Sequence, residues 1–146
     1  MTVYCLGFIF SPDLSQVVLL KKDRGTLVNC LNGIGGKCGN SEYPSEAMVR
    51  ECFEETNIKT CFEDWSYVGE IKSNPKDEWL INIYAKRSLY RPWDGKVNSL
   101  EEEIIVVNTK DVFFDERTYA PHTKALIIYS MEKLISSQRL ISIQDF

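Results

Sequence analysis

Short runs of apolar residues, some of them alternating with polar ones, predict a chain dominated by β-strands. Residues 2–10 (TVYCLGFIF) and 17–22 (VVLLKK) each read as a strand. The polar stretch 11–16 (SPDLSQ) between them predicts a turn, so that the two strands would form a hairpin. Further along, residues 79–89 (WLINIYAKRSL) predict a long strand with partial alternation, and residues 104–109 (IIVVNT) predict a short buried strand.

Two other segments have helical spacing. Pro44 is well placed as the first residue of a helix that continues to about Thr56, because proline fits the first turn of a helix. Asn57 follows as a left-handed stop. Residues 122–135 (HTKALIIYSMEKLI) carry apolar side chains at the spacing of a second helix, and the structure of the tail, residues 136–146, stays open.

The remaining segments connect these elements. Residues 23–40 predict a long glycine-rich loop, residues 59–73 predict one or two strands, and residues 91–103 predict a polar loop. No internal repeat and no linker divides the chain, and 146 residues suffice for one domain with a sizeable core. We therefore expect residues 1–146 to form a single domain of the α+β class with a mixed sheet.

Composition and charge narrow the range of partners. The formal net charge of −4 and the isoelectric point near 5.1 argue against a nucleic-acid partner, although a few local lysines could still bind a small nucleotide. Five cysteines without a C-x-x-C pair and a single histidine argue against structural zinc and favour free thiols. Because neither a secretory leader nor an apolar run of membrane length is evident, we expect a cytoplasmic protein that does not bind membranes.

The predicted first helix carries three carboxylates close together. Successive helical residues turn by about 100°, so that Glu55 lies at about 40° and Glu54 at about 300° from Glu51. Like charges at this spacing repel each other by a few tenths of a kcal/mol unless a cation lies between them. Carboxylate oxygens are hard ligands that suit Mg²⁺ or Mn²⁺ better than zinc. A solvated acidic face is the alternative interpretation of the same pattern.

The residues around this helix resemble the motif of a known family. Gly36, then Glu42 after five residues, then residues 50–58 (RECFEETNI) after seven more, match the spacing of the Nudix box. Every charged position of that box is met. Two positions depart, since Asn57 replaces the final glycine and Cys52 replaces a larger aliphatic residue. Asparagine adopts the left-handed conformation more readily than other non-glycine residues, so the helix can still end there.

The resemblance implies a fold, a reaction and a site. Nudix proteins have a mixed β-sheet in an α/β/α sandwich, and they hydrolyse nucleoside diphosphates linked to another group. By resemblance, the metal ligands would be Glu51, Glu54 and Glu55, assisted by the Gly36 carbonyl. Arg50 would orient these glutamates through charge-assisted hydrogen bonds, with Glu54 and Arg50 counted as catalytic. The expected cofactor is Mg²⁺, with Mn²⁺ as a substitute.

Family members often use a further carboxylate from a loop before a late strand. Residues 101–103 offer three glutamates at that place, and the spacing to the strand favours Glu103. By resemblance, Glu103 would be a metal ligand or the base that activates water. A solvated loop is the alternative interpretation of such a run.

The segment 31–37 (LNGIGGK) resembles the WNGFGGK segment of the MutT-type branch, whose members cleave oxidised purine nucleoside triphosphates. In that branch the asparagine contacts the base, and Asn32 has this position. Lys22 would lie near the pocket, Lys37 could bind a phosphate and Tyr119 could stack on a base. The alternatives are a turn residue at Asn32, an exposed loop lysine at Lys37 and simple packing at Tyr119.

These features together predict a Mg²⁺-dependent Nudix pyrophosphohydrolase. Its substrates would be nucleoside or deoxynucleoside triphosphates, with oxidised purine nucleotides among the candidates, and its products a nucleoside monophosphate and pyrophosphate. Two alternatives stay open: a pyrophosphatase for ADP-ribose or a dinucleotide, and a non-catalytic Nudix-fold nucleotide sensor. The partner would be a small nucleotide bound to a monomer or a homodimer.

Overall fold

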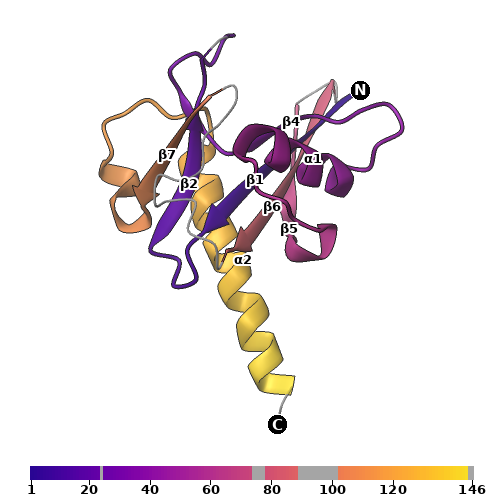
Figure 1. The fold of residues 1–146 in the computed structure, drawn as a ribbon. Coiled ribbons are helices and arrows are strands. Elements are labelled where there is room, and N and C mark those ends of the chain that lie inside the picture. The colour runs from indigo at the N-terminus through magenta and orange to yellow at the C-terminus, as the bar shows by residue number, and fades with distance from the viewer. Residues whose placement is uncertain (24, 74–77, 89–101, 145–146) are drawn as a thin grey trace.

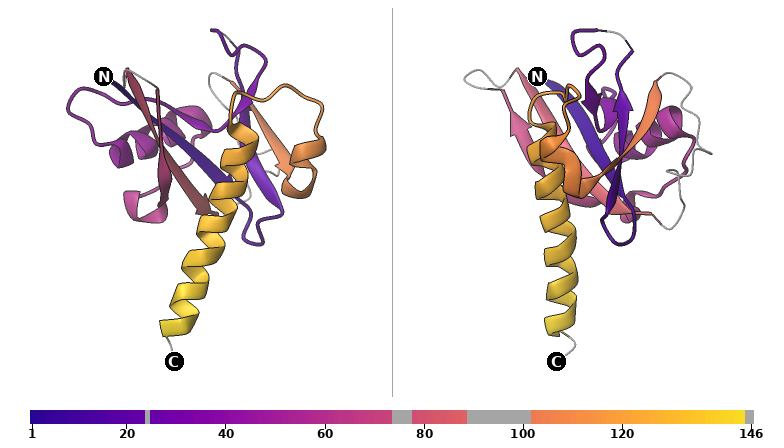
Figure 2. Two further views of the ribbon diagram at one scale, coloured as in Figure 1. Left: turned by 180° about the vertical axis from the view of Figure 1, so that it is seen from behind. Right: turned by 90° about the vertical axis from the view of Figure 1, so that its left-hand side faces the viewer.

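The computed structural model describes the chain apart from residues 24, 74–77, 89–101 and 145–146, and it describes only the backbone of residues 138–144. Seven strands form one mixed sheet, with a helix on each face (Figures 1 and 2). The strands are β1 (Thr2–Phe10), β2 (Gln16–Lys21), β3 (Leu31–Asn32), β4 (Ile34–Lys37), β5 (Ser66–Lys72), β6 (Trp79–Arg87) and β7 (Glu103–Asn108). The helices are α1 (Pro44–Thr56) and α2 (Thr123–Gln144), and short 3-10 helices span Phe62–Asp64 and Thr109–Phe114.

Strand β1 is the centre of the sheet. One of its edges pairs in parallel with β6 over its whole length, from Thr2 opposite Trp79 to Phe10 opposite Arg87. Its other edge is divided, because the first half pairs with β4 and only the last two residues pair with β2. Strand β2 pairs in addition with β3 and β7, so the sheet forks into two arms, one of which pairs with β3 and the other with β4.

Alternation along the strands divides the core into two parts. On the α2 face, Phe8 and Phe10 pack with Ile83 and Ile127, and all four side chains are essentially inaccessible to solvent. On the α1 face, Ile9 packs with Met48 among a second group of buried residues. Because adjacent strand residues point to opposite faces, each strand contributes to both parts.

The predicted α/β/α arrangement is therefore confirmed, as is the helix over 44–56. It ends as expected, with Asn57 in the left-handed region at a φ of 62°. The second helix is longer than predicted, since α2 begins at Thr123 and continues through the tail to Gln144. Among the described residues, no helix is long and apolar enough to cross a membrane.

The prediction of a continuous loop over residues 23–40 was wrong, because β3 and β4 lie within it. The glycines of this segment predict a loop, although the segment contains two strands. A Cβ at Gly35 would collide with the carbonyl oxygen of Cys5 on β1, so that this close strand pairing requires glycine. Residues 59–73 form one strand preceded by a 3-10 helix, and residues 91–101 of the predicted polar loop lie outside the described part.

Replacing Asn57 tests the end of α1. We expect Asn57→Ala to lower the free energy of unfolding by about 1 kcal/mol, because alanine tolerates the left-handed region poorly. Asn57→Gly should stay within about 0.5 kcal/mol of the wild type, since glycine adopts this conformation freely. Chemical denaturation measures both, with Asn40→Ala in the preceding exposed loop as the control. Equal losses for Asn57→Ala and Asn57→Gly would contradict the explanation.

Candidate active site

Arg50 on α1 holds the loop that follows β4. Its Nε and Nη2 donate to the two carboxylate oxygens of Glu42 at 2.8 and 2.9 Å, and Nη2 also donates to the Lys37 carbonyl at 3.1 Å. Its Nη1 donates to Glu51 at 3.0 Å and to Glu54 at 3.1 Å. One guanidinium therefore joins three acids and the end of β4, which is the planar, bidentate arrangement that arginine favours.

Glu42 closes the loop around this contact. Its Oε1 also accepts a hydrogen bond from the Gly39 N–H at 2.9 Å. The Arg50 guanidinium, assisted by that N–H, lowers the pKa of Glu42 to about 2, and the same contacts raise the pKa of Arg50. Glu42 thus stays ionised and fixes the loop.

Glu51 lies directly against the glycine loop. A Cβ at Gly36 would stand 2.5 Å from Oε1 of Glu51, so glycine at this position is what lets the carboxylate approach the backbone. The side chain of Glu51 is only 14% exposed. The structure therefore brings together a carboxylate and the main chain of β4 at the point where both were predicted to bind a metal.

Glu55 is the most buried acid of α1, with 3% of its surface exposed. One of its oxygens accepts the Gly35 N–H at 2.8 Å. Burial is the main reason why the pKa of Glu55 rises to about 8, and Glu51 and a hydrogen bond with Glu102 raise it further. Glu54 differs from both neighbours, because its side chain is 50% exposed and bonds only to Arg50 among the contacts described here.

The late carboxylate that joins these acids is Glu102 rather than Glu103. The side chain of Glu102 is 7% exposed and accepts a hydrogen bond from Lys22 Nζ at 3.0 Å. Glu103 is exposed and lies opposite Lys21 in the register of β2 and β7. Because neighbouring residues of an extended chain point to opposite faces, only one of the two can face α1.

The carboxylate oxygens of this cluster are suitable ligands for a divalent cation, but they do not point toward a common centre. Within the described ranges, no three His, Cys, Asp or Glu side chains are placed as a metal-binding group. The hydrogen bonds explain this, since Glu51 and Glu54 are turned toward Arg50 and Glu55 toward the Gly35 N–H. Yet the cluster contains only hard oxygen ligands, and burial, together with the nearby Glu51, disfavours the charged form of Glu55 and so raises its pKa.

The predicted substrate residues fall into two groups. Lys22 is bound to Glu102, and Lys37 is exposed at the end of β4 beside Arg50. Asn32 and Tyr119 lie at the other end of the β3–β4 segment, where Leu31 pairs with Tyr119 in an isolated parallel bridge. Lys22 also lies at this β3 end, since its N–H donates to the Cys30 carbonyl at 3.0 Å, so that Lys37 alone of the four predicted substrate residues lies at the β4 end.

Tyr119 is held firmly in place. Its hydroxyl donates to Asp115 at 2.7 Å, and Lys124 Nζ lies 4.8 Å from the centre of its ring. Burial and the contact with Asp115 raise the pKa of the Tyr119 hydroxyl. Arg117 binds both oxygens of Asp115, which lowers the pKa of Asp115. A base that stacks on Tyr119 would have to use the face away from Lys124.

Sequence reasoning missed three residues of this region. Glu102 was passed over for its neighbour, because alternation along the strand puts the two on opposite faces without showing which face lies toward α1. Asp115 and Thr123 had no visible signal, because their contacts with Tyr119 and Asn32 depend on how the chain enters α2.

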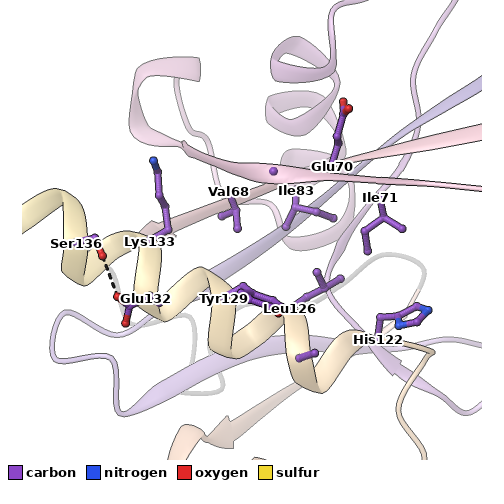
Figure 3. Close-up of a pocket in the computed structure, with 12 residues that line it drawn as sticks. Val68, Glu70, Ile71, Ile83, His122, Leu126, Tyr129, Glu132, Lys133 and Ser136 are labelled. Carbon is purple, nitrogen blue, oxygen red and sulfur yellow. Dashed lines mark hydrogen bonds between the residues drawn. The ribbon is translucent and has the colours of Figure 1, made fainter.

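A separate cavity of about 570 Å³ lies between α2 and the edge strand β5. Figure 3 shows its walls, formed by Val68, Ile71 and Ile83 from the sheet and by Leu126 and Tyr129 from the helix, with the Glu132–Ser136 hydrogen bond of 3.0 Å at its rim. It lies on the α2 face of the sheet, whereas the carboxylates gather on the α1 face. Its walls are mostly apolar, and Glu70, His122, Glu132 and Lys133 also line it.

Comparison with known proteins agrees with the resemblance seen in the sequence. The NUDIX domain model matches residues 3–127. A MutT/nudix family protein from Enterococcus faecalis superposes with a TM-score of 0.70 at 13% identity over 92% of this chain and 62% of that one, so the chain spans less than two thirds of that protein. No curated protein sequence matches the chain.

Two further solved structures with this fold are of proteins whose names mention a phosphorylated compound. The NUDIX domain of Shewanella oneidensis NrtR, in complex with ADP ribose, has a TM-score of 0.70 at 14% identity over 90% of this chain and 87% of that one. The E. coli dihydroneopterin triphosphate pyrophosphohydrolase has a TM-score of 0.64 at 14% identity over 86% of this chain and 91% of that one. At such identities the structural likeness establishes the fold alone.

The contact between Arg50 and Glu42 predicts a dependence of stability on pH. The pKa of Glu42 falls from 4.5 to about 2 on folding, so its contribution is present above pH 4.5 and is lost as the pH falls toward 2. The difference in unfolding free energy between the wild type and Glu42→Gln should therefore be largest near neutral pH and shrink below pH 4.5. Urea denaturation across this range measures it, with exposed Glu63→Gln as the control. A difference that does not change with pH would contradict the assignment.

Proposed function

Because the chain belongs to the NUDIX family, we propose that it is a metal-dependent pyrophosphohydrolase that converts nucleoside or deoxynucleoside triphosphates to the monophosphate and pyrophosphate. The observation that carries this proposal is the gathering of Glu51, Glu55 and Glu102 beside the Gly35–Gly36 backbone. Such a concentration of partly buried acids is costly unless a cation compensates it. A diphosphate substrate brings the remaining ligands for that cation.

Glu51, Glu54 and Glu55 would hold Mg²⁺ or Mn²⁺ together with the Gly36 carbonyl. When bound, the metal would neutralise charge on the diphosphate and lower the pKa of the attacking water. The protein prepares this site through Arg50, which keeps Glu51 and Glu54 on the side of α1 that faces the loop. Glu54, half exposed and held only by Arg50 among the described contacts, can turn toward a metal at little cost.

Glu102 replaces Glu103 in this proposal as the carboxylate that assists the reaction. It is buried beside Glu55 and lies on the α1 face, so it could accept a proton from water or bind a metal. Lys22 then serves to position Glu102 through the 3.0 Å ion pair rather than to bind substrate. Lys37, exposed next to the loop, remains the candidate for a phosphate contact.

The substrate class rests on the resemblance of the segment 31–37 to the MutT-type branch, with Asn32 at the base and Tyr119 beside it. The relatives with this fold include one solved with ADP ribose and one named for dihydroneopterin triphosphate, so the fold accepts several phosphorylated compounds. ADP-ribose is therefore the second candidate substrate, and the assay below includes it.

The proposal is tested by incubating the protein with Mg²⁺ and a panel of nucleoside triphosphates, deoxynucleoside triphosphates and ADP-ribose. We expect pyrophosphate and a nucleoside monophosphate from a triphosphate, and no product once a chelator removes the metal. Release of inorganic phosphate alone would contradict the reaction type. Binding without any product would favour the nucleotide sensor.

Removing the Glu54 carboxylate should lower turnover by about two orders of magnitude or more, because the metal site loses a charged ligand. The comparison is Glu54→Gln against Glu46→Gln, an exposed acid in the first turn of the same helix. Circular dichroism should show that both variants keep the fold. Turnover of Glu54→Gln equal to that of Glu46→Gln would remove Glu54 from the mechanism.

The adjacent glutamates at the start of β7 provide a second comparison, since Glu102 precedes the strand and Glu103 is its first residue. Glu102→Gln should lower kcat by about 100-fold, whereas Glu103→Gln should leave it within about twofold, because only Glu102 faces the acids of α1. Steady-state kinetics with the best substrate measure both. The reverse order of effects would restore the role to Glu103 and would mean that the register of β7 differs in the working enzyme.

A further inference from the structure

Helix α2 is longer than the part of the sheet that it covers. Its last buried residue among those described is Leu134, although the helix continues to Gln144. Figures 1 and 2 show its C-terminal half projecting beyond the sheet, away from the other elements. This projecting half, residues 135–144 (ISSQRLISIQ), contains four apolar residues and only one charged residue, Arg139. Because a helix of this length is barely stable alone in water, it indicates a partner against which it packs.

The cavity between α2 and β5 forms a groove beside the first half of the same helix (Figure 3). Val68 and Ile71 of β5 stand on one wall and are half-buried. Tyr129 stands on the α2 wall with 66% of its surface exposed. Strand β5 is the last strand of the sheet and pairs only with β6 among the described strands. The groove is therefore an apolar surface that no described element covers.

The groove and the projecting half of α2 share one stripe of the helix. Four residues of this stripe line the groove at alternating steps of three and four, namely Leu126, Tyr129, Lys133 and Ser136. The same steps continue into the projecting half at Leu140 and Ile143. Steps of this kind form the seam along which two helices pack in a coiled coil. One continuous seam, these six residues, thus joins the two uncovered surfaces.

We propose that two copies of the chain form a symmetric dimer in which their α2 helices pack antiparallel along this seam. The projecting half of each helix then lies in the groove of the other copy. A second copy fits better than an unrelated partner, because one chain carries both uncovered surfaces and a two-fold axis covers both at once.

Antiparallel pairing brings the apolar ends of the seam together. Leu126 lies opposite Ile143 of the partner subunit. Tyr129 lies opposite Leu140 of the partner subunit, which covers its exposed ring. The partner helix also covers Val68 on β5. Apolar surface that each copy leaves in water is thereby buried in the dimer.

Charged residues select the register and the direction of the two helices. Lys133 stands in the middle of the seam, and a single lysine at such a position specifies the register of paired helices. Glu132 and Arg139 each precede a residue of the seam, are one heptad apart and have opposite charges. In the antiparallel pair, Glu132 of each copy lies beside Arg139 of the other. A parallel pair would separate these charges.

Sedimentation equilibrium of the 146-residue chain over a range of concentrations tests the dimer. We expect a monomer–dimer equilibrium whose upper limit is twice the 16.8 kDa of one chain. Leu140→Lys lies beyond the last buried residue of α2, so it should keep the circular dichroism of the wild type but stay monomeric. Val28→Lys is the control, because Val28 is an exposed apolar residue in the loop before β3, and this variant should dimerise normally.

An exchange of charges tests the antiparallel register. Glu132→Arg places two cations together on each side of the axis and should raise the dimer Kd by about tenfold, and Arg139→Glu should do the same with two anions. The double variant Glu132→Arg/Arg139→Glu restores both contacts with the signs reversed, so its Kd should return to near the wild-type value. A double variant as weak as the single ones would overturn the register.

Two further results would overturn the dimer itself. One is a dimer that Leu140→Lys leaves intact, because the contact would then lie elsewhere. The other is a monomer at every concentration, and co-sedimentation with vesicles of phosphatidylcholine and phosphatidylglycerol would then show whether a lipid surface covers the projecting helix instead. Nucleotide hydrolysis tests the proposed function separately, because the groove and the carboxylates lie on opposite faces of the sheet.

Discussion

The bidentate ion pair between Arg50 and Glu42 determines the arrangement of the whole site. It ties the loop after β4 to the middle of α1, and the same guanidinium reaches Glu51 and Glu54. The glycines then let the main chain of β4 approach the helix closely enough for the Gly35 N–H to meet Glu55. Loop, strand and helix thus form one rigid unit around the acids.

This unit concentrates negative charge where solvent is scarce. Glu55 is nearly inaccessible, Glu102 contacts it, and Glu51 lies close by, so that desolvation and, to a smaller extent, electrostatic repulsion disfavour the charged form of Glu55. Lys22 and the Gly35 N–H offset part of that repulsion. Buried acids lower stability and add nothing to the packing of the core. Such a departure is typical of a functional site.

Much of the fold could be predicted from the chain alone. The helix over 44–56 follows from Pro44 and the apolar spacing, and its end follows from Asn57. The strands β3 and β4 could not be predicted in the same way, because their glycines fit a backbone approach that only the folded sheet reveals. The length of α2 was also hidden, since residues 136–146 lack a clear stop signal.

The site likewise has one part that the local sequence predicts and one part that it does not. The spacing of the acids along α1 was enough to predict that they lie together, since they occupy consecutive turns of one helix. The choice between Glu102 and Glu103 needed the exact register of β7 against β2, where an error of one residue exchanges the two faces of the sheet. The contact of Thr123 with Asn32 joins residues 91 positions apart, and no local pattern in the sequence reports such a distance.

The divided edge of β1 has a mechanical consequence. Glu102 belongs to the arm made by β2 and β7, whereas Glu51 and Glu55 are anchored to the arm made by β1 and β4. The two arms touch along β1 at only two residue pairs, Ile9 with Val18 and Phe10 with Val17. The spacing between Glu102 and the acids of α1 therefore depends on how far the two arms diverge, and a ligand bound between the arms beside β3 would change that spacing.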